Sequence, residues 1–407
     1  MKLRLLILLT TALCGLCTAA AQPAPEKTTP REGIFTFGPG TTISADRELA
    51  PLAEYAAEYL GCGVRNGSVV LTLDAPDGEP SEAYPLDIAP DHIQIGSSTC
   101  GGVFNGLQQL FRLLPPEVYA RRGIAPGTGI ACVRIEDKPR FGYRGMMLDV
   151  ARTWIGMDEV KRYIDLFSYH NINKLHLHLS DDEGWRIEIL SHPELTEIGG
   201  FRGGDSPVRP VYGKWSEKYG GYFKQSEMRE LIRYAALRNI EIIPEIDLPG
   251  HSRNIASVHP EIRCNYPPDT VSTNGYDYRS AWCVAREENY ALLGDILGEL
   301  CELFPSEYIH VGGDEVDMSQ WERCPDCRAL MKREGMTDPH RLEDLFMERM
   351  AAILRSHGKR PAVWNEAVRT GAFARECRVH GWESVKACLD ATAKGYRTVV
   401  MPGQYFY

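Results

Sequence analysis

From residue 141 onward, the hydrophobic pattern alternates between short apolar runs and longer amphipathic stretches. Seven apolar runs have the length and composition of buried strands, at 143–150, 174–180, 240–247, 308–314, 361–366, 378–383 and 397–402. Stretches with helical apolar spacing separate most of them, at 158–169, 226–239, 287–303, 341–357 and 384–394. Repeated strand–helix units indicate a parallel sheet, and seven of them predict an α/β fold, a (β/α)8 TIM barrel, over residues 141–407. Because only seven strands are counted, we expect the barrel to be truncated before its last unit.

The pattern before residue 141 is different and predicts a separate small domain. Helical spacing at 46–60 and 102–114 is combined with strand-like runs at 68–74, 84–88 and 92–96. This mixture predicts an α+β accessory domain over residues 33–140, with a structural or packing role. The preceding segment, residues 22–32, is rich in Pro, Thr and Lys and is predicted to be a linker.

The first 21 residues have the three parts of a secretory signal peptide. Lys2 and Arg4 precede an apolar run at 5–16, and small residues follow at 19–21. The apolar run is too short to span a bilayer. We therefore expect an exported protein, periplasmic or extracellular, without a membrane span. Leu stands before both cysteines of this segment, which disfavours a lipoprotein.

Composition and net charge argue against nucleic acid as a partner. The 407 residues are 43% hydrophobic and 25% charged, which is typical of globular proteins. The formal net charge is −10, and the chain has no long run of Lys or Arg. A net negative chain is a poor match for a phosphate backbone, so nucleic acid is not expected as a partner.

Polar and aromatic side chains collect where the predicted strands end, which is where barrel enzymes place their active sites. In chain order these residues include Asp149, His176, His178, Asp182, Glu245, Asp247, His251, His310, Asp314, Glu315, Trp364, Glu366, His380, Trp382, Tyr405 and Tyr407. Flat aromatic side chains can cover the C–H faces of sugar rings, and carboxylates accept hydrogen bonds from hydroxyl groups. The combination predicts a carbohydrate-binding site.

The segment 312–315, Gly-Gly-Asp-Glu, places two acids side by side. Adjacent residues on a regular strand point to opposite faces, so both acids reach one pocket only if the strand ends or bulges there. The two glycines permit such a turn. We expect one carboxyl group to be desolvated against tryptophan and protonated, as a general acid requires, and its neighbour to stay charged.

Four sequence runs carry a resemblance to a known family: 144–149, 175–186, 243–251 and 310–315. Their residues and order resemble the β-N-acetylhexosaminidases of glycoside hydrolase family 20, over about residues 33–407. The small domain also resembles the family's accessory domain. The resemblance implies hydrolysis of terminal non-reducing N-acetylhexosamine residues (GlcNAc or GalNAc) from β-linked glycans, by a retaining, substrate-assisted mechanism that needs no cofactor.

The resemblance also implies a role for each acid. Glu315 would protonate the glycosidic oxygen, while the substrate's own 2-acetamido carbonyl attacks the anomeric carbon and forms an oxazolinium intermediate. Asp314 would hold the acetamido N–H and offset the positive charge. His251, oriented by Asp182 or Asp247, would lie behind the acid. Asp182 and Asp247 are counted among the substrate-binding residues.

Further residues match substrate contacts of the family. Arg144 matches the clamp on the far hydroxyl groups of the sugar, and Trp364 and Trp382 match the walls of the pocket. Tyr407 matches best, by position, the tyrosine that donates to the acetamido oxygen, and Tyr405 is the alternative. The family's last barrel unit supplies one more stacking Trp and a hydroxyl-binding Glu, which have no counterpart in this sequence.

Two other functions fit parts of the pattern. The pair His176 and His178, with His251, His310 and Asp314, would suit a metal-dependent hydrolase barrel, because both histidines of the pair face the same side of a strand. A non-catalytic carbohydrate-binding barrel would keep the tryptophans but would not need the paired acids. We expect the glycosidase, with no bound metal.

Cysteines are frequent enough to suggest cross-links after export. Export would remove two of the 12 cysteines. Cys264 and Cys283 bracket a loop rich in Pro, Asn and Gly, and we expect them to form a disulfide. Cys324 and Cys327 form a single CxxC motif, half of a zinc site at best, for which a local disulfide is predicted.

Overall fold

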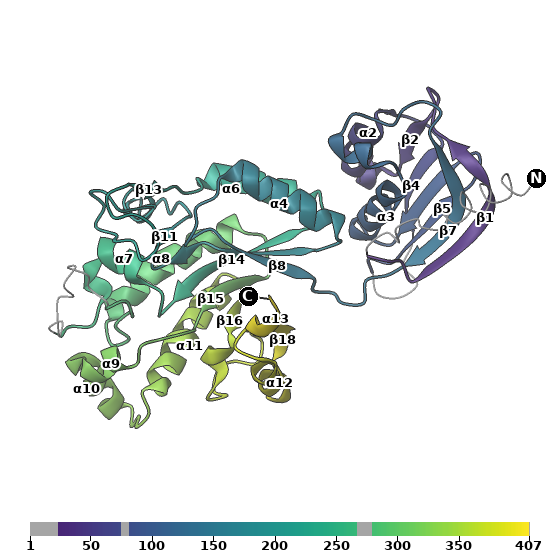
Figure 1. The fold of residues 1–407 in the computed structure, drawn as a ribbon. Helices are drawn as coiled ribbons and strands as arrows, with labels where there is room; N and C mark the ends of the chain where they lie inside the picture. Colours follow the sequence, from purple (N-terminus) through teal and green to yellow (C-terminus); the bar gives the residue numbers. More distant parts are fainter. Residues whose placement is uncertain (1–22, 75–80, 267–278, 407) are drawn as a thin grey trace, which may run out of the picture. The chain divides into compact units, whose positions relative to one another are not determined.

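The computed structural model describes residues 23–74, 81–266 and 279–406, which form two compact units (Figure 1). The first unit contains the described residues up to Arg144, with 164–173 and 236–240, and the second contains the rest. Each unit is built around one seven-stranded sheet. The predicted signal peptide lies outside the described residues. No helix within these ranges has both the length and the apolar character needed to cross a membrane.

The first unit has a mixed sheet with the strand order β1-β7-β5-β6-β4-β2-β3. Its strands are β1 Lys27–Thr36, β2 Thr42–Ala45, β3 Gly63–Val64, β4 Val69–Leu73, β5 Tyr84–Ile88, β6 Ile93–Ser97 and β7 Gly129–Asp137. The helices α2 (Ala50–Leu60) and α3 (Cys100–Arg112) pack against this sheet, and the short helices η1 (Arg47–Leu49) and η2 (Pro116–Ala120) flank them. Buried aromatic rings such as Tyr55, Tyr59, Phe104 and Phe111 fill the core between helices and strands. The predicted α+β domain is confirmed.

The linker predicted at 22–32 is wrong for residues 27–32. These residues form the first part of β1, which pairs antiparallel with β7 from Lys27 opposite Glu136. Nearly every side chain of β1 is exposed, so the strand has no apolar alternation that sequence patterns could detect. Pro30 is tolerated because β1 is an edge strand whose register shifts just after it.

The second unit has a parallel sheet whose strands follow chain order, β8-β9-β14-β15-β16-β17-β18. They are β8 Gly145–Asp149, β9 Lys174–His178, β14 Glu241–Leu248, β15 Tyr308–Gly312, β16 Arg360–Trp364, β17 Arg378–Gly381 and β18 Arg397–Val400. All seven coincide with predicted strands. The sheet is curled (Figure 1), and this order and curvature are those of a (β/α) barrel, which confirms the predicted fold class.

Helices connect successive strands of this sheet, as predicted. The long ones are α4 Met157–Tyr169, α6 Gln225–Ala236, α8 Glu287–Leu303, α11 His340–Ser356 and α12 Val385–Ala393. Shorter elements lie in the loops: β10 Ser180–Asp181, β11 Gly184–Trp185, α5 Glu194–Glu197, β12 Phe201–Arg202, β13 Tyr219–Gly220, α7 Arg253–Val258, η3 Pro260–Ile262, α9 Ser319–Arg323, α10 Pro325–Arg333, η4 Asn365–Val368 and α13 Gly403–Phe406. The longest of these insertions follow β9, β14 and β15, so the loops at the carboxyl ends of these strands are elaborate.

A fully buried arginine fixes the loop that follows β8. The guanidinium group of Arg186 donates hydrogen bonds to four main-chain carbonyls, those of Val150, Ala151, Gly200 and Gly221, at 2.6–3.1 Å. A buried cation is tolerated only when its donors are satisfied. This set of bonds therefore positions the chain immediately before Arg152.

The predicted disulfides are not formed. None of the ten described cysteines is in a disulfide bond. Cys264 was expected to pair with Cys283, but its sulfur lies 3.8 Å from that of Cys327. The four cysteines of the two predicted disulfides share one buried cluster instead.

Candidate active site

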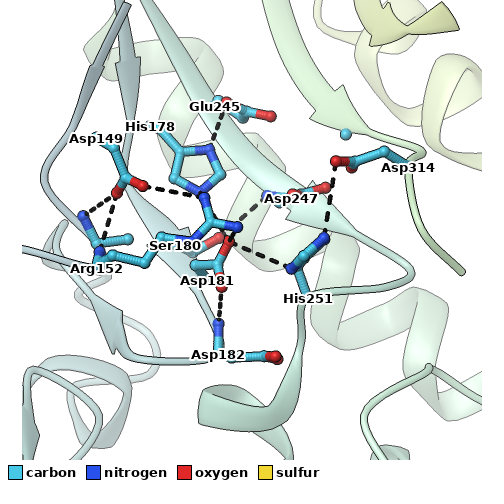
Figure 2. Close-up of polar contacts among 12 residues, drawn as sticks. Asp149, Arg152, His178, Ser180, Asp181, Asp182, Glu245, Asp247, His251 and Asp314 are labelled. Carbon is cyan, nitrogen blue, oxygen red and sulfur yellow. Dashed lines mark hydrogen bonds and ion pairs between the residues drawn. The ribbon is translucent and has the colours of Figure 1, made fainter. Parts of the chain in front are cut away.

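The carboxyl ends of four neighbouring strands bring ionisable side chains into contact (Figure 2). Asp149 ends β8, and Asp181 follows β9. Asp247 is the second-to-last residue of β14, and His251 lies in the loop after that strand. Asp314 and Glu315 follow β15. The strand order β8-β9-β14-β15 explains why residues so far apart in sequence meet at one edge of the sheet.

The turn after β15 needs both of its glycines. Gly312 and Gly313 have φ angles of +71° and +93°. A Cβ at Gly312 would lie 1.8 Å from Oδ1 of Asp247, and one at Gly313 would lie 2.6 Å from Cβ of Ala367. Only glycine fits such close approaches. The strand ends at Gly312, two residues before the predicted end at Asp314, and the turn directs both following acids toward His251.

His251 links the paired acids to the interior of the sheet. Its Nε2 lies 3.3 Å from Oε2 of Glu315 and 3.7 Å from Oδ2 of Asp314. Its Nδ1 lies 3.4 Å from Oδ2 of Asp181. That same oxygen lies 3.1 Å from Nε2 of His178, and Nδ1 of His178 lies 2.6 Å from a carboxylate oxygen of Glu245. A continuous chain of polar contacts thus runs from Glu245, which is fully buried, to Glu315 at the surface.

The ionisable groups in this series of contacts stabilise one another's charged forms. Burial alone would lower the pKa of His251, but hydrogen bonds to Asp181 and Glu315 outweigh it and raise the pKa well above its ordinary value. Burial would raise the pKa of Asp181, yet hydrogen bonds from His178 and His251 hold it below its usual range. His251 is therefore a cation between two carboxylates.

The expected desolvation of Glu315 is not observed. Its side chain is 57% exposed, and the hydrogen bond from His251 lowers its pKa. The main-chain N–H of Glu315 donates to Oε2 of Glu366 at 3.3 Å, which fixes the backbone at a φ of +48°. A left-handed backbone is unusual for a residue other than glycine and is typical of functional sites. In this state Glu315 is ionised, because it faces water and a charged imidazole.

Asp314 is the desolvated member of the pair, and Asp247 lies against it. Burial raises the pKa of Asp247 well above its ordinary value, and the nearby charge of Asp314 adds to this shift. Burial also raises the pKa of Asp314, against the opposing effects of His251 and of a hydrogen bond with Asp247. Two carboxyl groups in hydrogen-bond contact hold one proton between them. Asp247 is only 2% exposed, so the prediction that it binds substrate is wrong; it positions Asp314.

Asp182 does not hold His251 in place, because its carboxylate is bound by Arg253. Its carboxylate accepts a hydrogen bond from the main-chain N–H of Arg253 at 2.9 Å and pairs with that arginine's guanidinium group. Asp181 and Asp182 are adjacent residues in a short hairpin, so their side chains leave the chain in different directions. Asp181 therefore takes the position that was predicted for Asp182 or Asp247.

The predicted role of Arg144 is also wrong. Arg144 precedes β8, at the opposite end of the strand from Asp149. Its guanidinium group donates to the carbonyls of Asn171 and Phe141, at 2.6 and 2.8 Å, and pairs with Glu82. Each of its three guanidinium nitrogens therefore donates to a structural partner.

Arg152 is the arginine that the structure places in the site. Its Nη1 lies 3.0 Å from Oδ2 of Asp149, and its Nη2 lies 2.8 Å from Oδ2 of Asp181 (Figure 2). The side chain remains 29% exposed at the carboxyl edge of the sheet. The sequence held a usable signal, because Arg152 lies two residues beyond the predicted end of the strand at 150, whereas Arg144 lies near its predicted start.

The predicted aromatic residues lie at different depths. Trp364 ends β16 and is 5% exposed, with its ring centroid 4.6 Å from that of His310, so it forms a floor rather than an open wall. Trp382 follows β17 and is half-buried, and its main-chain N–H donates to Oδ1 of Asn365 at 3.0 Å. Tyr405 is 75% exposed in α13. Tyr407 lies outside the described residues.

The histidines of the alternative metal site surround Glu245. Its carboxylate lies 2.9 Å from Nε2 of His176 and 3.0 Å from Nδ1 of His310. The third histidine, His178, has one ring nitrogen against Glu245 and the other against Asp181. A metal bound by His176 and His178 together would have to displace these carboxylate contacts. The geometry therefore favours direct contacts between the histidines and Glu245 over a metal site.

Paired acids beside an imidazole, at the carboxyl ends of parallel barrel strands, define an acid–base site of the kind that glycoside hydrolases use. Comparison with known families agrees. Residues 141–407 match the sequence model described as "Glycosyl hydrolase family 20, catalytic domain", and residues 20–138 match "Glycosyl hydrolase family 20, domain 2". The chain belongs to glycosyl hydrolase family 20.

Individual relatives are consistent with this assignment. A beta-hexosaminidase of Vibrio furnissii is 34% identical over 400 residues, which cover 96% of this chain and 64% of that protein. A beta-hexosaminidase of Porphyromonas gingivalis is 30% identical, covering 94% of this chain and 49% of that protein. The chain therefore spans about half to two thirds of the length of these relatives.

A solved structure shows the same fold. The family 20 exo-β-N-acetylglucosaminidase of Vibrio harveyi, crystallised with N-acetylglucosamine, has a TM-score of 0.85 and 34% sequence identity. The similarity covers 94% of this chain and 60% of that one.

Proposed function

We propose that this protein is a β-N-acetylhexosaminidase that removes terminal non-reducing N-acetylhexosamine residues from β-linked glycans with retention of configuration. The observation that carries the proposal is the pair of unlike acids after β15, with buried Asp314 held by Asp247 and exposed Glu315 held by His251. The named activities of the relatives, and the N-acetylglucosamine in the Vibrio harveyi structure, support this substrate class.

Glu315 serves as the general acid. A pyranose that covers its carboxyl group removes water and raises its pKa, so that the protonated form is present when the glycosidic bond breaks. As that bond breaks, Glu315 gives its proton to the leaving oxygen, and the substrate's acetamido oxygen bonds to the anomeric carbon. Water then adds to the same carbon from the face of the departed group, returns a proton to Glu315 and releases the acetamido oxygen.

Asp314 holds the acetamido group during both steps. Its carboxylate accepts the acetamido N–H and stabilises the cationic oxazolinium intermediate, since a fixed negative charge acts strongly in a buried site. Asp247 keeps this carboxylate in place from below through the shared proton. No side chain of the protein forms a covalent bond to the sugar.

Arg152 takes the hydroxyl-binding role that the sequence assigned to Arg144. Its guanidinium group is anchored by Asp149 and Asp181 and is partly exposed at the same edge as the acids. Planar guanidinium groups with fixed partners present their remaining N–H donors in a set direction, which suits recognition of sugar hydroxyls.

The proposed export of the protein rests on the sequence of residues 1–21. The basic start, the short apolar run and the small residues that follow support a secretory signal. Export would bring the enzyme to glycans in the periplasm or outside the cell.

The decisive test compares aryl 2-acetamido-2-deoxy-β-D-glucosides and galactosides with the plain aryl β-D-glucoside. We expect at least about 10²-fold faster cleavage of a 2-acetamido substrate, because an attached nucleophile has a high effective concentration. Successive fluorination of the acetyl group should slow cleavage stepwise, and NMR should show the β-anomer as the first product. Equal rates on acetamido and plain glucosides, or a sugar bonded covalently to the protein, would reject the mechanism.

A pair of arginine variants tests the revised assignment. Arg152→Met should lower kcat/KM on the 2-acetamido substrate by at least about tenfold, the loss expected when hydrogen bonds from a charged group are removed. Arg144→Met should leave kcat/KM within about twofold and lower the melting temperature, since its contacts are structural. The opposite result for the two variants would restore Arg144 as the substrate contact.

A further inference from the structure

Four buried cysteines from two active-site loops form one cluster. Cys264 and Cys283 lie in the loop between β14 and α8, and Cys324 and Cys327 lie where α9 passes into α10. Their exposed fractions are 2%, 1%, 0% and 0%, respectively. Each can direct its sulfur to a common point, because one ligand atom from each lies within 4.8 Å of all the others.

The spacing of the sulfurs matches a shared metal ion. The Sγ–Sγ distances are 3.8 Å for Cys264 to Cys327, 3.9 Å for Cys283 to Cys324 and 3.7 Å for Cys283 to Cys327. A tetrahedral zinc ion with Zn–S bonds of about 2.3 Å separates its sulfurs by about 3.8 Å. Directly bonded sulfurs lie about 2.05 Å apart. Moreover, Cys283 has two sulfur neighbours at nearly equal distance, which is the arrangement of a ligand cage.

The surrounding main chain holds these sulfurs in place. The N–H of Cys283 donates to the carbonyl of Ile262 at 2.8 Å, and the N–H of Cys324 donates to that of Trp321 at 3.1 Å. The indole N–H of Trp321 donates to the carbonyl of Trp282 at 2.9 Å, which joins the two loops beside the sulfurs.

We propose that Cys264, Cys283, Cys324 and Cys327 bind one Zn²⁺ ion in a closed, structural site. Four thiolates in tetrahedral array are the donor set that zinc prefers, and they leave no open coordination position for water or substrate. The ion stabilises the fold and takes no part in bond cleavage. The CxxC motif, half of a site in the sequence, is completed by the two cysteines of the preceding loop.

The zinc site ties together the two loops that carry the catalytic groups. Next to Cys283, the indole N–H of Trp282 donates to Oγ of Ser252, the residue after His251, at 3.0 Å. On the other loop, Gln320 accepts the main-chain N–H groups of Ser280 and Ala281 at 3.1 Å each. Removal of zinc should therefore loosen the support of His251. This last consequence rests on the proposed function, whereas zinc binding does not.

The test measures metal in the full chain, purified without chelators or a polyhistidine tag. Inductively coupled plasma mass spectrometry should find one zinc per chain in the unaltered protein. In the Cys324→Ser, Cys327→Ser double variant, zinc should fall at least tenfold. The matched control is Cys301→Ser, a buried cysteine of α8 outside the cluster, which should retain the full amount.

A second measurement covers the case in which the double variant does not fold. Titration of the unaltered protein with an organomercurial reagent should release one equivalent of zinc, read with a chromogenic zinc indicator, as the four thiols react. Release of no zinc would overturn the proposal, and so would peptide mapping that shows disulfides among these cysteines. Iron in place of zinc would also overturn it. A Glu315→Gln protein should hold one zinc although its turnover of a 2-acetamido disaccharide is strongly reduced, which separates this site from the proposed chemistry.

Discussion

The Glu315→Gln variant is expected to lose at least about 10² in kcat on a 2-acetamido-β-glycoside with an alkyl or sugar leaving group. Glutamine keeps the size of the side chain and its contact with His251 but cannot give up a proton at a useful pKa. The leaving oxygen of a sugar or alkyl group must be protonated as it departs, so the step that the variant impairs is the bond cleavage itself. Steady-state hydrolysis of an N-acetylhexosamine disaccharide measures this loss.

The nature of the leaving group supplies an internal control. With a dinitrophenyl glycoside the departing oxygen is stable without a proton, so the same variant should lose much less in kcat/KM, which reports the first step only. Glu288→Gln, an exposed glutamate on α8, should behave as the unaltered enzyme on both substrates. Equal losses on both leaving groups, or normal activity on the disaccharide, would remove Glu315 from the role of general acid.

Replacing Asp314 by Asn should lower kcat by about 10²–10³, the usual cost of removing one preorganised group that stabilises transition-state charge. The carboxylate is buried beside His251 and Asp247, where a fixed charge is only weakly screened. Asparagine has the same shape but no charge to offset the oxazolinium cation, and its N–H2 group faces the acetamido N–H with the wrong polarity. The measurement is kcat on the 2-acetamido substrate.

The variant Asp390→Asn is the matched control for this loss. Asp390 is exposed on α12 and forms a surface ion pair with Lys386, and such pairs contribute little. Its kcat should equal that of the unaltered enzyme. If Asp314→Asn retained more than half of the kcat, the acetamido group would not depend on this carboxylate, and the assisted mechanism would lose its main support.

The barrel strands could be predicted from the sequence because parallel strands covered on both faces consist of short apolar runs. All seven strands of the second unit's parallel sheet coincide with such an apolar run. The edge strand β1 does not, since its side chains are exposed and its residues resemble a linker. Its partner β7 was also missed, although the two pair over most of their length. For β1 the exposed side chains leave no local pattern, whereas β7 alternates buried Ile130 and Cys132 with exposed positions, a pattern that was overlooked in the sequence.

The candidate site was partly predictable for the same physical reason. The acids after β15 and the histidine after β14 follow strand ends directly, and parallel strands bring their carboxyl ends together. Asp182 was named from the sequence and its neighbour Asp181 was not, and a shift of one residue reverses the direction of a side chain. The zinc cluster could not be predicted either, since Cys264 and Cys327 are 63 residues apart and meet only in the folded chain.

The hydrogen-bonded path from Glu245 through His178, Asp181 and His251 has an evolutionary consequence. Glu245 is 0% exposed, and three residues separate it from Glu315, the acid that meets solvent. Selection for work in more acidic or more alkaline surroundings could therefore act on the hidden carboxylate and its histidines while every sugar-facing atom stays unchanged. Related enzymes with identical pockets could differ in pH optimum through residues that no inhibitor would ever touch.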